Sequence, residues 1–85
     1  MREITISCPV MESPREFHII LARELEFPDW YGCNLDALHD QLTSLTADTR
    51  LILENFDNLG TWGRGFRKVF QDAEAQNPHF YIELL

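Results

Sequence analysis

Three short apolar segments, separated by stretches with helical spacing, constrain what this chain can fold into. Ile4 and Ile6 alternate with polar residues near the N-terminus, and residues 80–84 alternate in the same way near the C-terminus. Residues 50–54 form an apolar run, which is typical of a buried central strand. Strands separated by helices form parallel sheets with right-handed crossovers. The sequence therefore predicts an α/β fold of two layers: a three-stranded parallel sheet in the order 1-2-3, with helices covering one face.

Helices are predicted in the stretches between these strands. The first begins after Ser13, a good N-cap, and runs to about Glu26. The second begins after Asn34 and covers 35–42 or slightly beyond, and the last spans about 63–76. Each carries an apolar stripe that should pack on the sheet. The stripe residues are Phe17, Ile20, Leu21 and Leu25 in the first helix, Leu35, Leu38, Leu42 and Leu45 in the second, and Phe66, Val69, Phe70 and Ala73 in the last.

Length and composition predict one domain over residues 1–85. The hydrophobic fraction of 45% and the charged fraction of 25% are those of an ordinary globular protein. No apolar run approaches the ~20 residues that cross a bilayer, and the N-terminus lacks the apolar segment of a signal peptide. A cytoplasmic location is therefore expected. Cys8 and Cys33, the two cysteines, are expected to be free thiols there.

The acidic charge is concentrated in one part of the chain. The net charge is −7, and residues 24–57 contain eight acidic residues against one basic residue, Arg50. The remainder, with six acidic and six basic residues, is neutral. Such a surface repels nucleic acid and anionic membranes and attracts a basic protein. The alternative is a solvated acidic face that only aids solubility.

The second predicted helix carries an unusual set of polar residues. Asp36 and Asp40 lie four residues apart, so they share one side of the helix and repel each other by a few tenths of a kcal/mol. His39 and Thr43 fall on the same side, largely opposite the leucine stripe. We refer to these four residues as the acidic face. A cationic partner would explain the repulsion.

A pair of aromatic residues precedes this helix, in a turn over residues 28–33. Trp30 and Tyr31 could fold back over the core, or they could anchor a partner beside the acidic face. Protein interfaces favour such a mixture of aromatic area and charge. The sequence leaves both possibilities open. We refer to residues 28–33 as the aromatic turn.

Catalytic alternatives are weakly supported. Asp36, His39 and Asp40 are suitable ligands for zinc or manganese, but they supply three ligands at most. Cys33 and His39 lack the orienting group and oxyanion element of a thiol enzyme. There is no glycine-rich phosphate loop and no nucleophile-elbow motif. We therefore predict no enzymatic activity, no cofactor and no metal.

The run 28–42 closely resembles the signature of the barstar family, the small intracellular inhibitors of barnase-type ribonucleases. An aromatic pair, a glycine, the sequence Asn-Leu-Asp-Ala-Leu and a second aspartate carry the resemblance. The order of predicted elements matches the family over the whole chain, and residues 69–73 resemble its final helix. The resemblance implies a barstar-like fold. It also implies that the second helix and the preceding loop block the active site of a ribonuclease.

The resemblance also assigns a role to individual residues. The implied partner-binding residues are Trp30, Tyr31, Asn34, Asp36, His39, Asp40, Thr43 and Asp72. Asp40 would be the central acid in the enzyme cleft, Asp36 the second and Asp72 a peripheral one. His39 stands where the best-known member has a tryptophan, and Leu45 replaces another aromatic residue, so the rim of the implied interface differs.

The sequence thus predicts a non-enzymatic immunity protein. It would be a cytoplasmic monomer that forms a one-to-one complex with a basic ribonuclease toxin, and it would bind neither nucleic acid nor membrane directly. One alternative is a small metal-dependent enzyme that uses Asp36, His39 and Asp40. Another is a regulatory module whose acidic face binds a basic protein that is not a nuclease.

Overall fold

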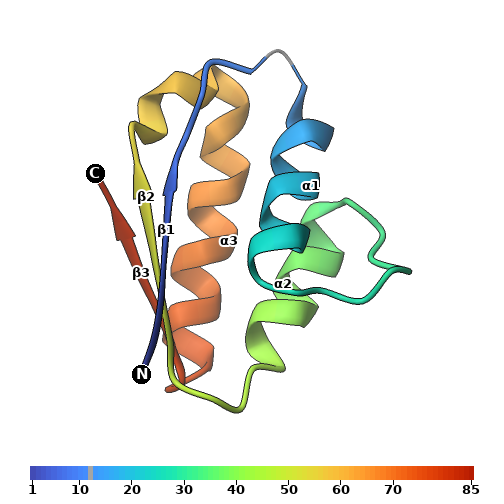
Figure 1. Ribbon diagram of the computed structural model, residues 1–85, viewed down its shortest axis with the longest axis vertical. Helices are drawn as coiled ribbons and strands as arrows, with labels where there is room; N and C mark the ends of the chain where they lie inside the picture. Colours follow the sequence, from blue (N-terminus) through green and yellow to red (C-terminus); the bar gives the residue numbers. More distant parts are fainter. Residues whose placement is uncertain (12) are drawn as a thin grey trace.

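The observed order of elements agrees with the predicted one. A computed structural model describes residues 1–11 and 13–85 of the chain. Its elements within these residues are β1 (Arg2–Ser7), α1 (Pro14–Glu24), α2 (Leu35–Thr43), β2 (Thr49–Glu54), a 3-10 helix η1 (Phe56–Trp62), α3 (Gly63–Gln76) and β3 (Phe80–Leu84). The strand order is β1-β2-β3, and both pairs are parallel. Figure 1 shows α1, α2 and α3 on the same side of the sheet. The predicted α/β fold is therefore confirmed.

The register of the sheet explains which strand faces are buried. Leu51 of the central strand pairs with Ile4 on one side and with Ile82 on the other. Leu51 and Leu53 are fully buried beneath the helices. Glu3 of β1 belongs to the opposite face of the sheet and is exposed. The alternation in the edge strands thus separates a face that packs on helices from a solvated face.

The helical stripes form one core with the sheet, with one exception. Phe17, Leu38 and Phe70 represent the fully buried side chains of α1, α2 and α3. Leu35 was predicted to be buried but is 36% exposed. It is the first residue of α2. A Cβ added to Gly65 of α3 would lie only 2.9 Å from the Cδ1 atom of Leu35 and would clash with it. Its side chain therefore lies over the N-terminal part of α3 at the edge of the core.

The predicted helix caps are confirmed. The Ser13 hydroxyl accepts a hydrogen bond from the backbone N–H of Arg15 at 3.2 Å. The side-chain oxygen of Asn34 accepts one from the N–H of Ala37 at 2.8 Å. These bonds satisfy amides that have no partner inside the helix. α1 ends at Glu24, two residues before the predicted end.

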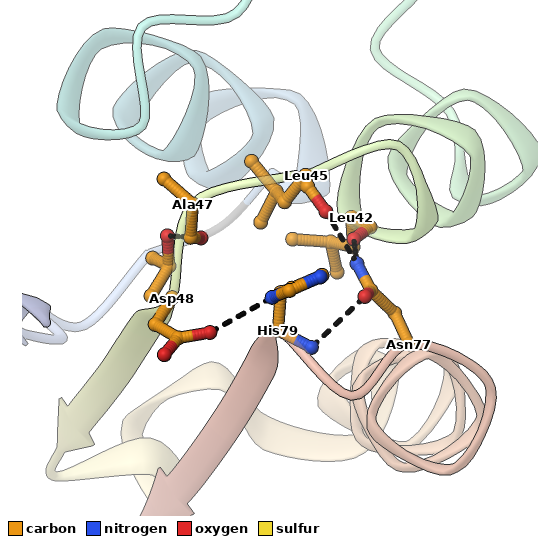
Figure 2. Close-up of polar contacts among 7 residues, drawn as sticks. Leu42, Leu45, Ala47, Asp48, Asn77 and His79 are labelled. Atoms are coloured by element: carbon orange, nitrogen blue, oxygen red, sulfur yellow. Dashed lines mark hydrogen bonds and ion pairs between the residues drawn. The ribbon is translucent and has the colours of Figure 1, made fainter.

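A buried asparagine joins the C-terminal ends of α2 and α3. The side-chain amide of Asn77 donates to the carbonyl oxygens of Leu42 at 2.8 Å and of Leu45 at 3.1 Å. Its side-chain oxygen accepts from the N–H of His79 at 3.0 Å, and the His79 ring in turn contacts Asp48 at 2.8 Å (Figure 2). Because Asn77 is only 4% exposed, its own bonds are largely shielded from water, whereas the contact between His79 and Asp48 is exposed. The bonds of Asn77 hold the end of α2 against α3.

Two expectations about the chain's surroundings can be compared with the structure. In the described part of the chain, no helix is long and apolar enough to cross a membrane. Both cysteines are free thiols, as expected, with Cys8 buried and Cys33 half-buried. Burial raises the pKa of the Cys8 thiol, which keeps it protonated and unreactive.

Candidate protein-binding face

The two aspartates of the acidic face are exposed on α2, while Leu38 and Leu42 bury its other side. Within residues 1–11 and 13–85, neither Asp36 nor Asp40 forms an ion pair. Their carboxylates are therefore fully available to a partner.

Asp36 and Asp40 differ in their position along α2 and therefore in their interaction with the helix dipole. Asp36 lies in the first turn, where the positive end of the helix dipole favours a negative charge. Asp40 lies near the C-terminal end, where the dipole is unfavourable, and the last turn contains no basic residue. Local stability can account for Asp36 but not for Asp40. Asp40 is therefore the residue of this helix that most needs an explanation outside the fold.

Hydroxyl groups support the backbone beneath the acidic face. The Thr43 hydroxyl donates to the carbonyl oxygen of His39 at 2.8 Å, and the Ser44 hydroxyl donates to that of Asp40 at 2.6 Å. Both bonds lie at the C-terminal end of α2, where carbonyl groups lack helical partners. Thr43 and His39 are half-buried, so the face has two exposed carboxylates beside two less accessible side chains.

The structure distinguishes the two residues of the aromatic pair. Trp30 is 76% exposed, whereas Tyr31 is 8% exposed and packs its ring against Phe27 at a centroid distance of 4.9 Å. For Tyr31, the alternative of a ring folded back over the core is the one the structure shows. A direct contact of Tyr31 with a partner remains a prediction. Trp30 is left as a large apolar side chain exposed in the turn that precedes α2.

Tyr31 also anchors the aromatic turn to α1. Its hydroxyl lies 2.7 Å from Nδ1 of His18, a residue that is 4% exposed. Burial lowers the pKa of His18, and burial, followed by the nearby Cys33, raises that of Tyr31. Both shifts favour the neutral forms. The sequence gives no sign that His18 pairs with Tyr31, which lies 13 residues away.

The end of the aromatic turn is tightly bent. Cys33 has a backbone φ of 51°, in the left-handed region that residues other than glycine rarely adopt. Asn34 follows, and its side-chain amide donates to the carbonyl oxygen of Gly32 at 3.3 Å while its oxygen caps α2. Asn34 therefore sets the direction in which α2 leaves the turn. In this way it positions the acidic face.

The last predicted site residue, Asp72, lies on α3. It is half-buried and forms an ion pair with Lys68, one turn earlier, at 3.5 Å. An exposed pair of this spacing stabilises a helix by about 0.2–0.5 kcal/mol. α3 packs against α2, so Asp72 belongs to the neighbouring helix rather than to the acidic face itself.

The structure does not favour the metal-dependent alternative. Among the residues that the structure describes, no group of three or more His, Cys, Asp or Glu side chains is placed to hold a metal ion. Asp36, His39 and Asp40 therefore do not converge on a common point.

The family model described as "Barstar (barnase inhibitor)" matches residues 1–84. The chain belongs to the barstar family. A relative from Bacillus subtilis (strain 168), named "Putative ribonuclease inhibitor YrdF", is 37% identical over 81 residues, and the match covers 89% of each chain. The resemblance to the barstar family that the run 28–42 carries is thus confirmed. The parallel sheet and helices of this structure are consistent with a barstar-like fold.

Proposed function

We propose that this chain inhibits a basic ribonuclease by placing α2 and the aromatic turn against its active site. The main support is the pair of exposed carboxylates on α2, which have no ionic partner among the described residues. A ribonuclease must hold basic groups where the substrate phosphates bind. Carboxylates that are already positioned on a helix can form charge-assisted hydrogen bonds with several of these groups at once. The family and the name of the Bacillus subtilis relative support the same partner.

The proposed contributions differ between residues. Asp40 is the dominant one, because the fold itself gives no reason for a carboxylate at its position. Asp36 is second, and Asp72 is weaker because it already pairs with Lys68. Trp30 supplies apolar contact area. Tyr31, Asn34 and Thr43 act mainly by holding the turn and the helix, through the bonds described above.

The biological role we propose is that of an immunity protein. The chain would act in the cytoplasm as a monomer, bind a barnase-type toxin one to one and have no catalytic activity of its own. Its acidic segment would speed the encounter with a basic toxin.

Single alanine variants at Asp36, Asp40 and Asp72 test the proposal, each assayed for folding and for inhibition of a barnase-type ribonuclease. Glu83→Ala is the matched control, because it removes an exposed carboxylate from β3 instead of α2. Removing one member of a desolvated charge pair at an interface costs about 2–5 kcal/mol, so Asp40→Ala should weaken binding by roughly 30- to 5,000-fold. Glu83→Ala should change it less than about threefold, in line with the small effect of an exposed charge.

Melting temperatures show whether a variant loses inhibition because it has lost a contact or because it has unfolded. Asp40→Ala should not lower the melting temperature, because it removes repulsion with Asp36 and an unfavourable interaction with the helix dipole. Full inhibition by an Asp36→Ala, Asp40→Ala double variant would show that another surface blocks the enzyme. If the wild-type protein fails to inhibit any ribonuclease but binds a basic protein that is not a nuclease, the regulatory alternative is correct.

A further inference from the structure

A pocket of about 450 Å³ lies where the α-helices begin. Its lining includes Ser13, Asn34 and Trp62, the N-cap residues of α1, α2 and α3. Figure 1 shows these helices running in the same direction, so their N-terminal ends face the same end of the molecule. The N-terminus of a helix carries a partial positive charge that favours anions. The pocket therefore lies at the N-terminal ends of α1 and α2 and beside the junction of η1 with α3.

A buried histidine supplies a hydrogen-bonding atom to this pocket. His18 is 4% exposed and lines the pocket, and its Nδ1 is occupied by Tyr31. Its Nε2 has no hydrogen-bond partner among residues 1–11 and 13–85. His18 lines the pocket, so among the described residues its Nε2 is left available to a ligand there.

The direction of the bond between Tyr31 and Nδ1 decides which ring nitrogen of His18 carries the proton. Among the described residues, the hydroxyl has no acceptor other than Nδ1 of His18. When the hydroxyl donates to Nδ1, the proton of the neutral imidazole resides on Nε2. His18 then presents an N–H donor to the pocket, which requires an acceptor on the ligand.

The charges around the pocket also favour an anion, although the whole chain carries −7. Among the described residues that line it, Arg15 is the one charged side chain. Glu16 and Asp36, the acidic residues in the first turns of α1 and α2, do not line it. A carboxylate in the pocket would meet a guanidinium and an imidazole N–H, and no acidic side chain belongs to the described lining.

Aromatic rings form much of the remaining wall. Phe66 packs against His18 at a centroid distance of 4.8 Å and against Trp62 at 5.6 Å. Leu35, left partly exposed by its position at the start of α2, adds apolar surface. Small-molecule sites typically have volumes of about 300–1,000 Å³, mostly apolar walls and a few convergent polar groups. This pocket fits each of these criteria.

We propose that the pocket binds a small aromatic carboxylate. The carboxylate accepts hydrogen bonds from the Arg15 guanidinium and from the Nε2–H group of His18, and the ring packs on Trp62 and Phe66. The pocket shares Cys33 and Asn34 with the proposed ribonuclease-binding surface, but testing it requires no ribonuclease. Its failure and the failure of the proposed function can therefore be told apart.

The test is a titration of the ¹⁵N-labelled protein with phenylacetate, followed by amide and imidazole chemical shifts. The matched neutral probe is 2-phenylethanol, which keeps the ring and loses the charge. We expect saturable shifts for amides that line the pocket and for the Nε2 resonance of His18. We expect phenylacetate to bind about tenfold more tightly than 2-phenylethanol, because hydrogen bonds to charged groups are stronger than neutral ones.

Arg15→Gln should weaken phenylacetate binding by about tenfold and leave the binding of 2-phenylethanol nearly unchanged. Arg23→Gln is the control, because Arg23 is another exposed arginine of α1 that does not line the pocket. Equal affinity for the two probes, equal affinity of the Arg15→Gln and wild-type proteins for phenylacetate, or shifts confined to another surface would each overturn the proposal. So would the absence of saturable shifts at millimolar phenylacetate. Both arginines are exposed, so neither variant should prevent folding.

Discussion

Replacing Asn77 with alanine should destabilise the protein more than almost any other change of a single polar side chain. The substitution removes two hydrogen bonds to the carbonyl oxygens of Leu42 and Leu45 and one from the N–H of His79. Each is worth about 1 kcal/mol net, and more where a buried group is left without a partner. The sum is about 3 kcal/mol. The Asn77 backbone, at φ −124°, suits alanine equally well, so the effect comes from the side chain.

Such a loss is large for a chain of 85 residues. At roughly 0.05–0.15 kcal/mol per residue, the total stability would be about 4–13 kcal/mol. For a domain of this size, 1 kcal/mol shifts the melting temperature by roughly 4–8 °C. We therefore expect Asn77→Ala to melt about 10–25 °C below the wild type.

Urea unfolding followed by far-UV circular dichroism measures this effect. The midpoint should fall while the slope of free energy against urea stays constant, because the same surface is exposed on unfolding. Asn58→Ala is the matched control: the Asn58 amide makes one bond, to the carbonyl oxygen of Cys8 at 2.8 Å, so the expected cost is about 1 kcal/mol. A change of less than about 0.5 kcal/mol in Asn77→Ala would refute the reasoning.

Four further predictions follow from the charges and the site. Burial lowers the pKa of His18 below its ordinary 6.5, so the unfolded chain binds a proton more readily than the folded protein as the pH falls. The urea midpoint should therefore fall between pH 7 and pH 5.5. A midpoint that does not change over this range would contradict the prediction. Association with a basic ribonuclease should slow as salt rises, in stopped-flow measurements, because the acidic charge of residues 24–57 is screened beyond about 10 Å at 0.1 M. His39→Trp should change relative affinities among ribonucleases with little change in melting temperature; if it unfolds the protein, His39 is a core residue. Chelators should leave the melting temperature unchanged, and stoichiometric zinc or manganese in protein purified without added metal would contradict that expectation.

Most of the fold could be predicted because its signals are local. Alternation near Ile4, the apolar run at 50–54 and the caps at Ser13 and Asn34 each depend on residues within one or two turns of each other. The parallel order 1-2-3 followed from the general handedness of crossovers, once strands and helices alternated. The exposure of Asp36 and Asp40 also followed from helical spacing alone.

Contacts between distant residues could not be predicted in this way. Trp30 and Tyr31 are adjacent and chemically similar, yet only Tyr31 turns inward, because Nδ1 of His18 on α1 lies within 2.7 Å of its hydroxyl. Asn77 is recognisable in the sequence only as the residue after the last helix. Its bonds to α2 exist because packing brings together helix ends that lie 35 residues apart.

The sequence by itself determined where helices and strands begin, which faces of them are apolar and where the acidic charge lies, because these properties depend on neighbours along the chain. Only the tertiary structure decided which side chains stay exposed and which are held by hydrogen bonds to distant residues. It turned Tyr31 into an anchor and left Leu35 exposed. It also brought His18 and Arg15 to one pocket where the helices begin. The physical reason is that burial and hydrogen-bond partners are properties of packed elements, and packing joins residues that the sequence keeps apart.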